Sequence, residues 1–133
     1  AEKGKTTAMR CITCHHINGA GPNYAPDLRG WGKGQTPEVI ARSIVEPSAE
    51  ISHGYAGTTV ELKDGGLIHG LALTDKNADP VIIQSMGGIT QLVPKKHINK
   101  VADLNRSLML SADQLQLKAQ DIADLVAFLR SYE

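Results

Sequence analysis

Apolar residues recur along the chain with two different periods, and each period predicts a different kind of element. Apolar residues spaced three or four positions apart, or runs of good helix formers, mark three segments: residues 3–14, 36–46 and 112–131. Thr36 stands where a helix N-cap is expected, and Ser111 and Gln114 have the spacing of a capping box. The pattern therefore predicts helices over these segments, with the last one starting near residue 112.

Between residues 55 and 98 the apolar period changes to two, which is the period of a half-buried β-strand. Residues 64–66 and 87–88 are glycine-containing turn signals, each flanked by alternating segments. The pattern predicts a small antiparallel sheet of about four strands, arranged as two hairpins. We expect the strands at residues 58–63, 67–74, 81–86 and 89–93.

These elements predict a mainly α-helical fold with an inserted sheet, which is an α+β class. At 133 residues the chain has the length of one domain, 1–133, with the β-rich insert at 55–98 inside it. The 14 basic and 14 acidic residues balance, which argues against a nucleic-acid-binding protein. No apolar run approaches the length of about 18 residues that a membrane span needs. No signal-peptide pattern opens the chain, so we expect a mature form or an excised domain.

The clearest chemical signal is the motif Cys11-Ile12-Thr13-Cys14-His15, which has the C-x-x-C-H spacing of covalent haem attachment. Two thiols separated by two residues on one helical turn can both reach the vinyl groups along one edge of a porphyrin. The imidazole of the next residue, His15, is then placed to bind the iron. The motif therefore predicts one haem c, bound through Cys11 and Cys14, with His15 as the proximal ligand.

The sequence gives less support to three other roles for Cys11 and Cys14. A redox dithiol normally follows a strand in a βαβ pattern, and no strand is predicted before Cys11. A structural zinc site would need a remote histidine, because the chain holds no cysteine outside the motif. A disulfide between the two cysteines would close a loop too small to add much stability. The motif thus favours haem over these alternatives.

Residues 16–34 are rich in glycine and contain two prolines, so we expect a loop that covers the proximal face of the haem. A ligating histidine normally donates its second ring N–H to a nearby carbonyl, which fixes its tautomer. The carbonyl of Pro26 is the acceptor that we expect for His15. Trp31 is the only tryptophan, and its indole is expected either beside the haem edge or in the core.

The second axial position decides between two kinds of function. An occupied position favours electron transfer, and an open one favours ligand binding or catalysis. Met109 lies in a predicted loop just before the last helix and is the expected ligand, in line with the His/Met pairing known for haem iron. His53, between the second helix and the first strand, is the best alternative. Other residues considered for the position have more ordinary roles in packing, strands or turns: Met9, Met86, His16, His69 and His97.

The ordered set of motifs resembles class I c-type cytochromes, and more specifically the Planctomycete/Verrucomicrobium-type haem-binding domain. The likeness extends over nearly the whole chain and is carried by residues 11–19, 26–28, 30, 43–48, 51–55, 64–66, 107–109 and 124–129. The resemblance implies a cytochrome c core of about three to four helices around one haem, with the sheet inserted before the loop of the axial methionine. Leu110 departs from the family, which commonly has proline directly after the methionine.

We therefore expect a one-electron carrier and not an enzyme, either free or as the electron-accepting domain of a larger oxidoreductase. The resemblance implies a periplasmic or otherwise exported location and a redox partner such as an exported dehydrogenase or terminal oxidase. The alternative hypothesis is a haem enzyme or gas-binding sensor with His53 or a displaceable ligand on the distal side. The insert at 55–98 is expected to act as an interaction module that selects the redox partner.

Overall fold

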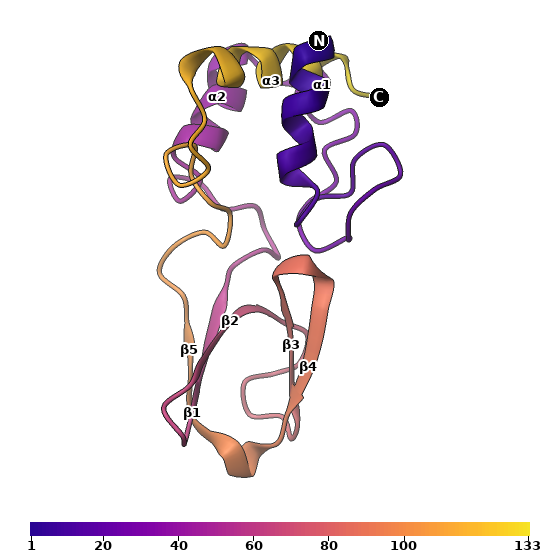
Figure 1. The fold of residues 1–133 in the computed structure, drawn as a ribbon. Coiled ribbons are helices and arrows are strands. Elements are labelled where there is room, and N and C mark those ends of the chain that lie inside the picture. The colour runs from indigo at the N-terminus through magenta and orange to yellow at the C-terminus, as the bar shows by residue number, and fades with distance from the viewer. The chain divides into compact units, whose positions relative to one another are not determined.

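The computed structural model describes residues 1–133, which form two compact units (Figure 1). Residues 1–50 and 109–133 make up the first, here called the helical unit, and residues 51–108 make up the second, the sheet unit. Three α-helices and a five-stranded antiparallel sheet confirm the predicted α+β class. None of the helices is long and apolar enough to cross a membrane.

Three helices build the helical unit: α1 (Glu2–Ala8), α2 (Pro37–Val45) and α3 (Ala119–Ser131). As Figure 1 shows, α1 packs across α3. Gly4 allows this close approach, because a Cβ atom there would overlap the carbonyl oxygen of Asp124 and press on Phe128. The buried core of the unit comes from both ends of the chain and from α2: Ala8, Ile17, Ile40, Ile44, Ala112, Leu125, Phe128, Leu129 and Tyr132.

Helix α2 begins directly after Thr36, as the sequence predicts. The Thr36 hydroxyl oxygen accepts a hydrogen bond from the backbone N–H of Val39 at 3.3 Å, and a proline occupies the first turn. Ile40 and Ile44, one turn apart, are both buried. The helix predicted over 36–46 is thus confirmed to within one residue at each end.

The first helix is shorter than the predicted 3–14, and that prediction is wrong at its C-terminal end. Helix α1 ends at Ala8, and Met9–Cys11 continue as one turn of 3₁₀-helix. After Cys11 the chain is no longer helical, and the carbonyl of Cys14 accepts a hydrogen bond from the N–H of Ala25, in the loop of residues 16–34, at 2.9 Å. The motif therefore ends in a turn that faces the loop.

The last helix begins at Ala119, so the predicted start at residue 112 is also wrong. The predicted capping box is present: the Ser111 N–H donates to Gln114 Oε1 at 2.9 Å, and the Gln114 N–H donates to Ser111 Oγ at 3.2 Å. However, this box caps only a single turn and not a long helix.

A left-handed residue ends that turn. Gln116 has a φ of +56°, and the N–H of Leu117 donates back to the carbonyl of Ala112 at 2.9 Å, which is the closure typical of a helix C-terminus. Helix α3 then starts with a new cap, in which the backbone N–H of Lys118 donates to Asp121 Oδ2 at 2.8 Å.

The sheet unit contains five antiparallel strands in the order β4-β3-β2-β1-β5. Their bounds are β1 (Thr58–Leu62), β2 (Leu67–Ala72), β3 (Val81–Ser85), β4 (Ile89–Val93) and β5 (Ile98–Asp103). The four predicted strands are all present, and alternate residues of them fill a separate small core: Val60, Val81, Ile83 and Val93.

The prediction of about four strands is wrong in number, because it omits β5. The pairing of β1 with β5 shifts register between Glu61 and Leu62, which makes Asn99 an extra residue on β5. This bulge places Ile98 and Val101 three positions apart, although both pack against the core of the sheet unit. The alternation that marks the other strands is therefore lost in this one.

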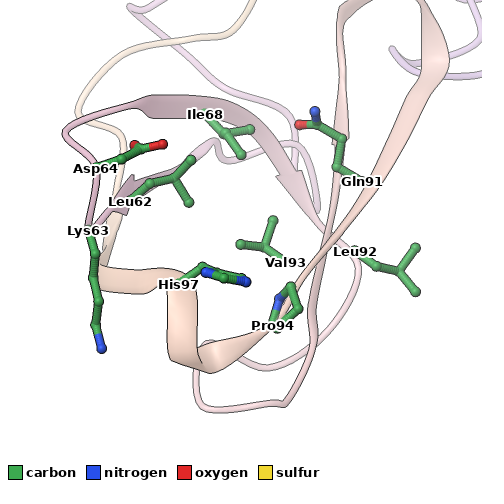
Figure 2. Close-up of a pocket in the computed structure, with 9 residues that line it drawn as sticks. All are labelled: Leu62, Lys63, Asp64, Ile68, Gln91, Leu92, Val93, Pro94 and His97. Atoms are coloured by element: carbon green, nitrogen blue, oxygen red, sulfur yellow. The ribbon is translucent and has the colours of Figure 1, made fainter.

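The sheet unit also contains an open groove of about 720 Å³, shown in Figure 2. The groove lies between the β1–β2 turn and β4, and its apolar lining residues include Leu62, Ile68 and Val93. Its lining includes no cysteine or methionine, and its one histidine is His97. The groove therefore lacks the thiols that covalent haem attachment needs.

Candidate haem-attachment site

Cys11, Cys14 and His15 lie together where the first helical segment ends. The backbone N–H groups of Cys14 and His15 both donate to the carbonyl of Cys11, at 3.2 and 2.9 Å. These bonds fold the motif into a single turn, and both thiols are free and half-buried. The two thiols therefore come from the same turn, as attachment to one porphyrin edge requires.

Burial raises the pKa of both thiols above the usual value for cysteine. At Cys11 the charge of Cys14 adds to the increase, and the neighbouring Arg10 opposes it. A reactive dithiol needs a lowered pKa instead, because only the thiolate attacks a disulfide. The surroundings of the two cysteines therefore do not favour the redox-dithiol alternative.

His15 is the buried polar residue of the helical unit, with 8% of its surface exposed. Its Nδ1 atom lies 2.7 Å from the carbonyl oxygen of Pro26. A backbone carbonyl only accepts, so Nδ1 carries the proton and Nε2 keeps its lone pair for a metal. Burial lowers the pKa of His15, and the bond to Pro26 opposes this shift. The ring is thus neutral near pH 7, which is the form that binds a metal.

Gly21 also belongs to this site, although the sequence pattern alone does not identify it. A Cβ atom at Gly21 would overlap the carbonyl oxygens of Ile12 and His15, and its φ of +90° also requires glycine. The carbonyl of Gly21 in turn lies 2.7 Å from Nδ1 of His16. The pair Gly21-Pro22 marks a turn in the sequence, but only the fold shows that this turn packs against the motif.

Met109 and Trp31 are both half-buried and pack against the core cluster of the helical unit. Cys11 packs against the same cluster. The fold thus brings one thiol of the motif and the predicted axial methionine to one core, although they are far apart in sequence. His53, the alternative ligand, is exposed in a turn of the sheet unit.

The other residues considered as ligands have different surroundings. Met9 is 45% exposed, and His69 Nδ1 lies 3.0 Å from the hydroxyl of Thr59 on the neighbouring strand. His69 belongs to the sheet unit, as do Met86 and His97. No group of three or more His, Cys, Asp or Glu side chains is placed to hold a metal ion. Two thiols beside an oriented imidazole fit a covalently attached haem better than a tetrahedral zinc site.

Comparison with known proteins agrees with this donor set. A family model described as Cytochrome c matches residues 1–83, which include the motif, the loop, α2 and the strands as far as β3. No match was found among curated proteins. Because the family match extends over more than half of the 133 residues, the chain belongs to the cytochrome c family, whose haem c is bound covalently, and Cys11 and Cys14 fit that attachment.

Proposed function

We propose that the chain is a monohaem electron carrier whose axial ligands are His15 and Met109. One observation carries the proposal: His15 is buried with its ring oriented by Pro26, and Met109 packs on the same core as Cys11. An imidazole and a thioether are the ligand pair of cytochromes c. Met109 lies outside residues 1–83, so its proposed role is supported by this packing and not by the family match.

Each residue has a distinct task in this proposal. Cys11 and Cys14 tether the cofactor, and Pro26 holds the ring of His15 in one orientation. Trp31, packed at the edge of the core, helps to exclude water. Haem c, when bound, supplies a one-electron couple. With His15 and Met109 as its two ligands, the iron would keep the same coordination in both oxidation states, and the packed side chains around it would rearrange little, which would favour rapid electron transfer.

Cytochrome c domains are typically exported or periplasmic, and electron transfer implies a redox partner. We propose a periplasmic or otherwise exported location for this chain. In the same proposal, the partner is an exported dehydrogenase or a terminal oxidase. The narrower likeness to the Planctomycete/Verrucomicrobium-type domain stays a prediction.

The ligand assignment is tested by absorption spectra of the purified haem protein, ferric and ferrous, with and without carbon monoxide. The haem of the wild type is expected to be low-spin and to show the weak far-red ferric band that indicates a sulfur ligand to the iron. The ferrous wild type is expected not to bind carbon monoxide. Met109→Ala is expected to lose the far-red band and to bind carbon monoxide. Met86→Ala, which removes the thioether of a residue of the sheet unit that is 44% exposed, is the matched control and should leave both properties unchanged.

Two results would overturn the proposal. An unchanged spectrum and reduction potential in Met109→Ala would exclude Met109 as a ligand, and His53→Ala would then be the next variant. Rapid carbon monoxide binding by the wild type would show an open iron, and a haem enzyme or gas sensor would replace the electron carrier.

A further inference from the structure

The loop of residues 16–34, which contains the His15 acceptor Pro26, is tied to the last residues of the helical unit. The backbone N–H of Asn18 donates to the phenol oxygen of Tyr132 at 3.0 Å. The N–H of Gly30 donates to the backbone carbonyl of the same tyrosine at 2.8 Å. One residue thus holds the loop on both sides of Pro26.

Tyr132 is itself held firmly. Only 8% of its surface is exposed, and its ring stacks on Phe128 with the ring centroids 5.2 Å apart and an interplanar angle of 23°. Both rings belong to the same buried cluster as Ile17, which is fully buried next to Asn18. The phenol oxygen therefore presents a fixed acceptor to the start of the loop.

The end of the loop has further ties to the same region. Gly32 lies so close to α3 that a Cβ atom would overlap the carbonyl oxygen of Leu129. Lys33 forms an ion pair with Glu133. By contrast, the one backbone–backbone hydrogen bond of residues 21–27 joins the N–H of Ala25 to the carbonyl of Cys14. The position of Pro26 therefore depends on the bond of Ala25, on the close packing of Gly21 and on the anchors at the two ends of the loop.

We propose that Tyr132 is a positioning residue for His15. It acts through the loop: its phenol oxygen and carbonyl anchor residues 18 and 30, the loop between them places the Pro26 carbonyl, and that carbonyl orients the imidazole. This inference rests on the proposed function, in which His15 binds the haem iron.

The contact between His15 and Pro26 links this anchor to the redox chemistry. Donation of the Nδ1 proton to a carbonyl makes an imidazole more electron-rich, which favours the ferric over the ferrous iron. A looser loop weakens that donation. Removal of the Tyr132 hydroxyl therefore raises the reduction potential.

The test compares Tyr132→Phe with Ser131→Ala in the haem-loaded protein. Tyr132→Phe keeps the stacked ring and removes only the acceptor of the Asn18 N–H. Ser131→Ala removes a hydrogen bond of the same helix end, from the serine hydroxyl to the Phe128 carbonyl at 2.9 Å, which does not touch the loop. The measurements are the reduction potential, the hydrogen exchange of the Asn18 amide and the exchange of the His15 ring N–H.

In Tyr132→Phe we expect a higher reduction potential and exchange about fivefold faster at both positions, the effect of losing one ordinary hydrogen bond. Ser131→Ala should match the wild type in all three. A wild-type potential in Tyr132→Phe, or an equal shift in Ser131→Ala, would overturn the positioning role. Failure of the proposed function would look different: the wild type itself would then lack a low-spin, histidine-ligated haem.

Discussion

The helical unit and the sheet unit are assembled in opposite ways. The helical unit gathers its core from the N-terminus, the middle and the C-terminus of the chain. The sheet unit uses one continuous stretch, residues 51–108, and completes a separate core within it. All five of its strands pair only with strands of the same unit, mostly between neighbours in sequence.

This difference bears on where the chemistry lies. The sheet unit lies in sequence between the two segments of the helical unit. The residues proposed for the haem site nevertheless all belong to the helical unit: Cys11, Cys14, His15, Pro26, Trp31 and Met109. A long insertion costs a fold little when the insertion packs on its own, because loop-closure entropy grows slowly with length. The sheet unit is therefore free to take a different role, and partner selection stays the prediction for it.

The largest effect is expected from removing the attachment chemistry. The double variant Cys11→Ala/Cys14→Ala should retain no haem after denaturation, because no other cysteine exists in the chain. Leu92→Ser, at a 63%-exposed position of the sheet unit, should retain a full complement. Haem staining of denatured protein measures both. Loss of haem in the Leu92 variant would show that the sheet unit takes part in attachment.

Two glycine substitutions, one in each unit, test whether the helical unit and the sheet unit unfold independently. Gly4→Ala drives a Cβ atom into the Asp124 carbonyl of α3, and Gly70→Ala drives one into the Gln84 carbonyl of β3. Each should cost about 2–3 kcal/mol from overpacking. In α1 this outweighs the gain of about 1 kcal/mol in helix propensity that alanine brings.

The two variants should lower unfolding midpoints that are followed by different signals. Gly4→Ala should lower the unfolding midpoint followed by haem absorption, whereas Gly70→Ala should lower the midpoint of the sheet followed by amide exchange. An equal fall of the haem signal in both variants would contradict independent cores and indicate one cooperative unit.

The smallest effect is expected at the ion pair of Lys33 and Glu133, because both side chains are largely exposed. Lys33 holds the pKa of Glu133 below its usual value. A lowered carboxyl pKa in the folded state gives stability that is present above the usual pKa and is lost as pH falls through the lowered one. Lys33→Gln should therefore lower the melting temperature slightly at neutral pH and not at all in strong acid.

Lys3→Gln removes the same charge from a lysine of α1 that forms no ion pair, and it serves as the control. A melting-temperature difference between Lys33→Gln and the wild type that grows as pH falls would contradict this account of the pair.

Local features of this protein follow from the sequence. The haem motif is five consecutive residues, and α2 carries its cap, its first-turn proline and its apolar face within one short segment. Four strands alternate regularly around glycine turns, so they are recognised from neighbours alone. In each case the residues that define the element lie within a few positions of one another.

Other features depend on partners that are distant in sequence, and only the tertiary structure decided them. The bulge that removes the apolar alternation of β5 arises from the pairing of β5 with β1. The close packing at Gly21 arises from contact with carbonyl oxygens of the motif. The capping box at Ser111 is real, but a left-handed Gln116 ends its turn after a few residues. Tyr132 anchors a loop more than one hundred positions away. Periodicity records which face of an element is apolar, and it contains no information about which distant backbone groups that face will meet.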